Sequence, residues 1–532
     1  MNYRSKTHNS RRTQKKKYNG VSFDGGIVKE PMITFGGSHI HVDPKTGISL
    51  YGPYTPEGVK NPTLGNIIAG IVGPKEMVSD SLRWLDACTD LLTNDGTNPY
   101  SNPHFPGVTI DGPYQCNLVF GETWYEVIKD ELIAEALKGS YNERLNKLVK
   151  LYIEAIGVLS QREPKPSVVL VCIPQKIIDL CTVRIGSDGK EERLKLNKSE
   201  KKALKVAKAG QTFLFDDMNP MSKVEAKVYD HKNLRRGIKA EAMRYGIPTQ
   251  IVWPRTLNLT PSKTNRKELS SQDLATKAWN FTTAMYYKAG GTPWRLKHID
   301  PSVCFVGISF YRDIHESTTK MHSSMAQSFT SSGDGYVLRG KTFEWDQSKS
   351  KSPHLDKGGS KEIIDQVIQL YKQQNKGSLP SRIVIHKTSK FWDEELEGFK
   401  DACKDIPGAD FVAFGNRNIS FFRPGMYPPI RGTYLKLSAE DFLLYTTGFV
   451  PYYKTYNGPR TAKPLDIIQY EGDSPWTKML EEIMALTKMN WNTASFSCGM
   501  PITIAFSKKV GEILAELPSD IQVIKPEYRF YM

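Results

Sequence analysis

Residues 235–252 read R-R-G-I-K-A-E-A-M-R-Y-G-I-P-T-Q-I-V, and residues 281–294, after a polar insertion, read F-T-T-A-M-Y-Y-K-A-G-G-T-P-W. The first stretch predicts a helix that ends near Tyr245 and turns through I-P-T into a short apolar strand. The second predicts another helix, which A-G-G closes because glycine accepts the left-handed conformation at a helix end. Side chains from three successive elements are therefore expected near one another.

Four side chains in these stretches suit an anion. Arg235 and Lys239 are four residues apart and share one face of the first helix. Gln250 comes as the strand begins, and Lys288 ends the second helix. A terminal phosphate accepts several charge-assisted hydrogen bonds at once, so these cations and the amide fit it well. A basic pair on a helix is also typical of a solvated face, but the order and spacing of all four residues favour a pocket for the end of a nucleic acid.

This order of residues resembles the guide pocket in the MID domain of Argonaute proteins, especially the short prokaryotic ones. In that family the 5′ phosphate of a guide strand is held by a Tyr or His, then Lys, Gln and Lys. The resemblance assigns the last three places to Lys239, Gln250 and Lys288. Arg235 stands where Tyr or His is usual, which keeps a phosphate donor without an aromatic ring.

Other segments extend the resemblance over nearly the whole chain. Residues Glu30 to Tyr54 look like the opening of short prokaryotic Argonautes, and H-F-P-G at His104 to Gly107 fits the same region. Ordinary turn chemistry also explains the glycines and prolines of both segments. The C-terminal third resembles a PIWI domain of RNase H type, through V-C-F-V-G-I-S-F, R-I-V-I-H-K-T and P-I-T-I-A-F-S-K-K-V-G-E-I-L.

The pattern of elements predicts an α/β protein of two lobes. In the first lobe a buried parallel strand at Pro166 to Pro174 lies between helices expected at 142–159 and 223–245, an alternation typical of a Rossmann-like sheet. In the second, RNase H-like lobe we expect helices at 362–374 and 476–489, and strands at 303–310, 383–386, 411–414 and 502–506.

The predicted domains follow from this pattern and from the resemblance. We expect a basic disordered tail over 1–24, an N-terminal extension plus MID domain over 25–297, and a PIWI domain over 298–532. No PAZ domain is expected.

Three positions in the PIWI-like segments bear on catalysis. RNase H-type cleavage needs several carboxylates, sometimes with a histidine, to hold two divalent ions at the scissile phosphate. The family's acids would stand at Ser309 in the first strand, at Thr388 after the second, and at Lys508 in the last helix, where Asp or His is expected. These replacements predict a protein that does not cut its target.

The formal net charge of +15 favours a polyanionic partner, because each neutralised phosphate releases counter-ions. Residues 1–17 hold seven Lys and Arg and no acid, so nearly half of that charge lies in the predicted tail. The net charge of the rest of the chain is modest, as expected if basic residues line a channel while most of the surface has balanced charge.

Several classes of site and location have no support in the sequence. We find no zinc spacing, no Walker motif and no Gly-rich dinucleotide motif. The seven cysteines are dispersed without a C-x-x-C pair, which is typical of buried thiols. The sequence has no apolar run of membrane-spanning length and no secretory signal, so a cytoplasmic location is expected by default.

The end of the chain, P-E-Y-R-F-Y-M, supports a further expectation. It resembles short Argonautes whose terminal carboxylate helps to hold a divalent cation against the guide 5′ phosphate. The resemblance implies Mg²⁺ held by the Met532 carboxylate and Gln250, since hard oxygen ligands suit this ion. The alternative is that Phe530 and Tyr531 only pack the tail onto the PIWI lobe.

The preferred interpretation is a slicing-inactive short Argonaute that binds a 5′-phosphorylated guide, RNA in this family. It would pair the guide with complementary single-stranded invader DNA and signal to an effector in prokaryotic immunity. The resemblance implies a separate APAZ-domain partner, fused to a TIR or sirtuin-like NAD-consuming domain or to a nuclease, and leaves open a higher oligomer after target binding. Two alternatives remain: a guide-dependent nuclease with acids at other positions, and a bare nucleic-acid scaffold.

Overall fold

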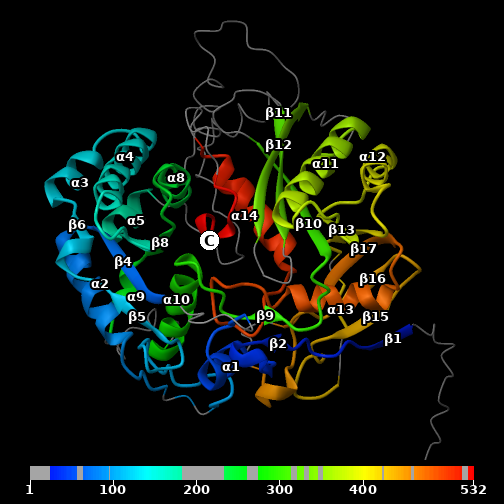
Figure 1. Ribbon diagram of the computed structural model, residues 1–532, viewed down its shortest axis with the longest axis horizontal. Helices are drawn as coiled ribbons and strands as arrows, with labels where there is room; N and C mark the ends of the chain where they lie inside the picture. The colour runs from blue at the N-terminus through cyan, green and yellow to red at the C-terminus, as the bar shows by residue number, and fades with distance from the viewer. Residues whose placement is uncertain are drawn as a thin grey trace, which may run out of the picture.

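A computed structural model of the chain describes residues 24–532 except 57–63, 95, 97, 182–232, 260–272, 313–319, 329–334, 345–351, 418, 422–423, 457–460 and 518–524. Residues 1–23, nearly all of the predicted basic tail, lie outside the described residues. Figure 1 shows two lobes side by side, the first drawn in blue to green and the second in green to red. The predicted α/β fold of two lobes is confirmed.

The first lobe is built on a parallel sheet with the strand order β5-β4-β7-β8, in which β6 also pairs with β4. Its strands are β4 (Gly65–Gly73), β5 (Cys116–Val119), β6 (Tyr125–Val127), β7 (Val168–Cys172) and β8 (Thr249–Val252). Its helices are α2 (Lys75–Ala87), α3 (Asp130–Ala136), α4 (Tyr141–Ser160), α5 (Gln175–Cys181), α8 (Leu234–Ala242), α9 (Pro254–Leu257) and α10 (Leu274–Lys288).

The central strand β7 explains the layers of this lobe. Its side chains alternate between two cores: Val169 and Val171 pack with α4 and α8, whereas Leu170 and Cys172 pack with α2 and α10. Every residue of β7 is buried, as the apolar run between two prolines predicts. Helices therefore cover both faces of a parallel sheet, and the Rossmann-like prediction is confirmed.

The second lobe is built on a mixed sheet with the strand order β1-β15-β16-β17-β14-β13-β10-β11-β12. Its strands include β10 (Val303–Arg312), β11 (Lys320–Ser328), β12 (Tyr336–Glu344), β13 (Arg382–Lys387), β14 (Ala409–Gly415), β15 (Thr433–Lys436), β16 (Phe442–Leu444) and β17 (Leu465–Gly472). β10, β13 and β14 run parallel, with α11 (Lys357–Gln374) and α12 (Asp393–Cys403) on one face. α13 (Trp476–Leu486) and α14 (Ile502–Leu514) belong to the core on the other face.

The strand predicted at 502–506 is wrong, because these residues form the first part of helix α14. The sequence I-T-I-A-F alternates like a strand, and a short apolar run does not by itself distinguish a buried strand from a buried helix. Pro501 is the N-cap residue of this helix. α14 is buried on most of its sides, so its apolar residues lack the clear period of a surface helix.

The N-terminal segment, residues 24–56, contacts both lobes. Its first strand β1 (Asp24–Ile27) pairs with β15 in the second sheet, beside which Figure 1 draws it in dark blue. A small sheet of β2 (Ile33–Thr34), β3 (Ile40–His41) and β9 (Arg295–Leu296) follows, next to α1 (Pro44–Tyr51). Glu30 forms ion pairs with Arg431 and Lys488 of the second lobe at 2.9 and 2.8 Å. The predicted domain boundaries, including the division at 297/298, stay a prediction.

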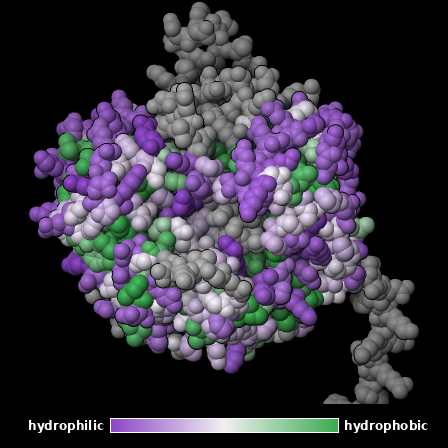
Figure 2. Space-filling model, in the orientation of Figure 1, coloured by the Kyte–Doolittle hydropathy of each residue, from purple (hydrophilic) through white to green (hydrophobic). Residues whose placement is uncertain are grey.

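The surface and the cysteines fit the composition. Figure 2 shows hydrophilic residues over much of one face of both lobes. Six of the seven cysteines are buried and Cys498 is half-buried, all as free thiols, in agreement with the predicted buried thiols. Burial raises the pKa of the Cys172 thiol to about 12, which keeps it protonated. In the described part of the chain, no helix combines the length and apolar character needed to cross a membrane.

Candidate anion-binding site between the lobes

Two lysines of the first lobe lie close together and almost completely buried. Lys239 and Lys288 are each 2% exposed. Lys239 Nζ donates to the carbonyl oxygen of Thr249 at 2.9 Å and to the main-chain oxygen of Met532. Lys288 Nζ donates to Gln250 Oε1. Three of the four predicted pocket residues thus meet beside the end of the chain, which Figure 1 marks near α8, α10 and α14.

Ordinary helix and turn chemistry brings these side chains together. The short 3₁₀ turn after α8 closes at Gly246, which has φ +64°, and the chain then enters β8. Gln250 of β8 pairs with Leu170 of the buried strand β7, which fixes its position in the sheet. α10 ends at Lys288, and Gly290, with φ +107°, turns the chain away. The predicted strand and second helix are confirmed, and so is the first helix from Leu234 on, whereas residues 223–232 of its predicted range lie outside the described residues.

Arg235 is the exposed member of the predicted set. It lies one turn before Lys239 on α8, and its charge reaches the two buried lysines, since it contributes to lowering the pKa of both. The structure therefore brings all four predicted residues to one region, with Arg235 on its solvent side.

Lys509 joins this region from the second lobe, and the sequence interpretation missed it. It lies half-buried on α14, and its charge contributes to lowering the pKa values of Lys239 and Lys288. Its ammonium lies 5.7 Å from the ring centroid of Phe506, one helical turn earlier. The three-residue spacing of Phe506 and Lys509 is a signal in the sequence that could have identified Lys509. It puts Lys509 on the same helix face as an apolar core residue, whereas its neighbour Lys508 is exposed.

We call Arg235, Lys239, Lys288 and Lys509 the pocket cations. Burial, followed by repulsion from Arg235 and Lys509, lowers the pKa of Lys288 to about 7. Burial, followed by repulsion from the other three pocket cations, lowers the pKa of Lys239 well below its usual value. Among the described residues, no Asp or Glu side chain forms an ion pair with a pocket cation. An anion entering this region would relieve the repulsion and favour the charged lysines.

The two lobes are joined next to the pocket cations. Arg236 of α8 forms an ion pair with Glu512 of α14 at 2.9 Å. The backbone N–H of Asn233, which caps α8, donates to Glu516 Oε1 at 2.8 Å. α8 and α14 are thereby held against each other, so a ligand of the pocket would contact both lobes.

Comparison with known proteins agrees with this architecture. No family model matches the chain. The Argonaute protein of Cereibacter sphaeroides is 22% identical over 374 residues, which cover 64% of this chain and 45% of that protein. The structure of Clostridium butyricum Argonaute, bound to a guide DNA and a 19-mer target DNA, has a TM-score of 0.59 at 18% identity, covering 94% of this chain and 54% of that one. Drosophila Piwi has a TM-score of 0.55 at 14% identity, covering 96% and 56%.

The chain has the Argonaute fold. The resemblance to the Argonaute family is confirmed, and the first and second lobes are its MID and PIWI lobes. The chain spans about half the length of the proteins that it matches. The pocket cations lie at the junction of the MID and PIWI lobes, from α8 and α10 of one and α14 of the other.

The two oxygens expected to bind Mg²⁺ lie in the MID pocket, and each is already in contact with a lysine. Gln250 Oε1 and the main-chain oxygen of Met532 are hard ligands of the kind that Mg²⁺ takes. Each already accepts a hydrogen bond from a lysine ammonium, Lys288 in one case and Lys239 in the other. A divalent ion at either oxygen would lie beside a buried ammonium, and Mg²⁺ at this place stays a prediction.

Two of the three predicted catalytic positions are neighbours in the PIWI lobe. The register of the parallel strands β10 and β13 pairs Ile308 with Lys387, so Ser309 and Thr388 follow at neighbouring positions. Lys508 lies on α14, which packs against β10, and its side chain is exposed. Two hydroxyls therefore lie at neighbouring positions at this end of the sheet, where the family resemblance expects acids.

The histidine beside these positions is a core residue. His386 is 1% exposed and its Nδ1 lies 2.7 Å from Thr503 Oγ1 of α14. Burial lowers the pKa of His386 to about 3, so the ring is neutral. In the described ranges, no group of three or more His, Cys, Asp and Glu side chains is placed to hold a metal ion.

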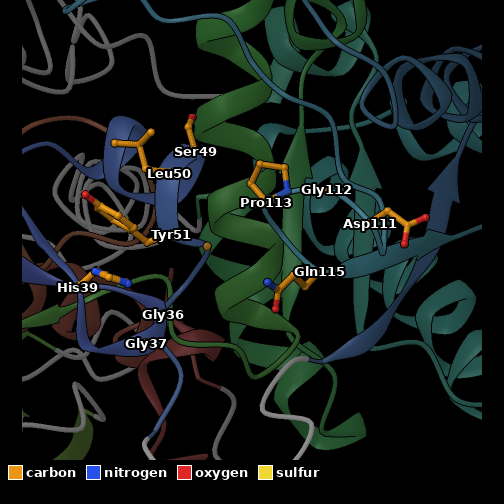
Figure 3. A pocket seen from close by; sticks show the side chains of 11 residues that line it. Gly36, Gly37, His39, Ser49, Leu50, Tyr51, Asp111, Gly112, Pro113 and Gln115 are labelled. Atoms are coloured by element: carbon orange, nitrogen blue, oxygen red, sulfur yellow. The ribbon is translucent and has the colours of Figure 1, made fainter.

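A separate cavity of about 510 Å³ lies on the N-terminal segment. Figure 3 shows His39 and Tyr51 on one side of it, and the loop of Asp111, Pro113 and Gln115 on the other. His39 stacks on Tyr51 with ring centroids 4.4 Å apart. None of its lining residues is a pocket cation, so this cavity does not replace the MID pocket as the candidate site for a phosphate.

Proposed function

We propose that this protein binds the 5′ phosphate of a guide strand in its MID pocket and uses the guide to recognise a complementary nucleic acid. The observation that carries the proposal is the cluster of pocket cations, two of them buried, without an acidic side chain as partner among the described residues. A phosphomonoester supplies about two negative charges and three acceptor oxygens, which such a cluster lacks. Clostridium butyricum Argonaute, which shares the fold, binds a guide DNA and a target DNA.

Guide binding with matched 5′ ends tests this proposal. A fluorescent short RNA with a 5′ phosphate should bind more tightly than the same RNA with a 5′ hydroxyl, by roughly 10- to 100-fold for each charged hydrogen bond lost. The double change Lys239→Ala and Lys288→Ala should remove the preference, whereas Lys150→Ala, on the exposed side of α4, should keep it. Equal binding of the two RNAs by the wild-type protein would refute the assignment.

We propose further that the protein does not cut the target. With Ser309, Thr388 and Lys508 in place of acids, the PIWI site lacks the oxygen ligands that two-metal cleavage needs. A matched target incubated with guide and Mg²⁺ or Mn²⁺ should stay intact while it remains bound. Cutting at one phosphate, at a fixed distance from the guide 5′ end, would instead support the alternative of a guide-dependent nuclease with acids at other positions.

The output that fits a non-cutting Argonaute is a signal to a second chain. We propose a guide RNA, an invader single-stranded DNA target and an APAZ-domain partner with a TIR or sirtuin-like NAD-consuming domain, acting in the cytoplasm in prokaryotic immunity. Target pairing has an effect only if the active and inactive partner differ in affinity for the target-loaded form. The complex with this partner should stay silent with guide alone and consume NAD after the complementary DNA is added. Equal NAD consumption with and without the target DNA would exclude activation of the partner by target pairing.

A further inference from the structure

The helix that carries two of the pocket cations is held at its start by the other lobe. Asn233 caps α8, and its backbone N–H donates to Glu516 Oε1 at 2.8 Å. Glu516 is 2% exposed and lies in the turn that follows α14, in the PIWI lobe. Figure 1 draws α8 and α14 next to each other, where the two lobes meet. A buried carboxylate of one lobe therefore holds the N-terminus of a helix of the other.

A second contact lies three residues further along α8. Arg236 forms an ion pair with Glu512, in the last turn of α14, at 2.9 Å. The Asn233 side chain accepts a hydrogen bond from the Arg236 backbone N–H at 3.3 Å, so both contacts start from one capped turn. A helix attached at two points is held against sliding along its neighbour and against rotation about its own axis. The two contacts therefore decide in which directions the side chains of α8 point.

The direction of two of these side chains matters for the pocket. Arg235 lies between the two attachment points, and Lys239 follows one turn later on the same face. Lys239 Nζ meets the carbonyl oxygen of Thr249 and the terminal oxygen of Met532 in this orientation of α8. A rotation of the helix by a fraction of a turn would move both cations away from a shared ligand and Lys239 away from its two oxygens.

Charge alone gives the opposite expectation for Glu516. Glu516 is an acid beside a helix that carries cations for a phosphate, and a nearby negative charge weakens the binding of an anion. If only charge mattered, a neutral residue at this position would strengthen phosphate binding. The carboxylate of Met532, which contacts Lys239, is the same in every variant of Glu516 and so does not affect this comparison.

Resting on the proposed guide binding, we infer that Glu516 is a positioning residue for the MID pocket. From the PIWI lobe it sets the orientation of α8, and thereby the affinity for a 5′ phosphate, through the backbone N–H of Asn233. Because the contact between the lobes favours the arrangement that binds phosphate, a bound 5′ phosphate favours that contact by the same free energy. Guide loading and the packing of the two lobes are therefore linked.

Two changes at Glu516 separate its position from its charge. Glu516→Asp keeps the charge but withdraws the acceptor oxygen, whereas Glu516→Gln removes the charge and keeps an acceptor at the same reach. In the full chain, the preference for 5′-phosphorylated over 5′-hydroxyl RNA should fall about tenfold in Glu516→Asp. In Glu516→Gln it should stay within about twofold of the wild type. Affinity for the 5′-hydroxyl RNA should change less than about twofold in both variants, since the effect is confined to the phosphate pocket.

Matched controls come from Glu154, an exposed acid of α4, where the changes to Asp and to Gln should both keep the wild-type preference. An unchanged preference in Glu516→Asp, or a change in Glu516→Gln alone, overturns the inference and leaves guide binding standing. An equal loss of affinity for both RNAs in Glu516→Asp shows a general structural role and overturns it too. Absence of a preference in the wild-type protein overturns the proposed function and the inference together.

Discussion

Two clusters of buried cations in this protein differ in what surrounds them. In the PIWI lobe Arg382, 7% exposed, donates to the carboxylates of Asp410 and Glu482. In the MID pocket, among the described residues, Lys239 donates to the carbonyl oxygen of Thr249 and to the terminal oxygen of Met532, and Lys288 donates to Gln250 Oε1. A buried charge is costly unless it is paired. The Arg382 cluster is therefore paired within the protein, whereas the pocket cations have no Asp or Glu partner among the described residues, as a site for a ligand anion would require.

The largest expected effect separates the two clusters by stability. Arg382→Met leaves Asp410 and Glu482 buried without their counter-ion, so the free energy of unfolding should fall by about 3–5 kcal/mol. Lys239→Met loses the hydrogen bonds to Thr249 and to the terminal oxygen of Met532, but it also relieves the repulsion from the other three pocket cations, so its loss should be smaller than that of Arg382→Met. Urea unfolding of the guide-free variants measures both values. Similar losses of stability in the two variants would contradict the claim that the Arg382 cluster is structural and the MID pocket is a binding site.

The sequence was most informative where local pattern and chemistry agree. The helix of Arg235 and Lys239, the strand of Gln250 and the helix that ends at Lys288 were all predictable, because caps, glycines and apolar spacing lie within each segment. Lys509 was missed because its role depends on how α14 packs between the lobes, which nothing near it in sequence specifies.

The pairing of strands that lie far apart in the sequence could not be predicted either. β1 joins a strand about four hundred residues later in the chain, and no short-range signal reports such a register. The helix at 502–514 was misread in its first part for a related reason, since burial on most sides removes the helical period from its apolar residues. The closeness of Met532 to Lys239 was expected from the family resemblance alone.

A pH series sharpens the comparison further. The pKa of Lys288 in the folded, guide-free protein is about 7, below the usual 10.5. Lys288 therefore lowers the free energy of unfolding at every pH at which the unfolded chain still carries this proton. That penalty is complete below about pH 7 and shrinks as the pH rises from 7 toward 10.5. Lys288→Met should therefore be more stable than the wild type by the largest margin at neutral pH and below, and the margin should decrease toward alkaline pH. If the stability advantage of Lys288→Met over the wild type grew with pH, the lowered pKa of Lys288 would be contradicted.

The smallest effect on stability is expected at the contact between α8 and α14 beside the pocket. The Arg236–Glu512 pair is partly solvent-exposed, so Arg236→Ala should cost no more than about 1 kcal/mol in the free energy of unfolding. Lys150→Ala, which removes an exposed pair 3.9 Å long within α4, is the control. A loss at Arg236 as large as that at Arg382 would show that this ion pair, and not the shared hydrophobic core, holds the lobes together.

Thermal unfolding with matched guides tests most directly the claim that the pocket cations await a phosphate. A ligand that binds only the folded state raises the melting temperature, and more so when it binds more tightly. The account predicts that a 5′-phosphorylated guide raises the melting temperature of the wild-type protein clearly more than its 5′-hydroxyl counterpart. It also predicts that this difference disappears in the Lys239→Ala, Lys288→Ala double variant. Equal shifts with both guides in the wild-type protein would contradict it.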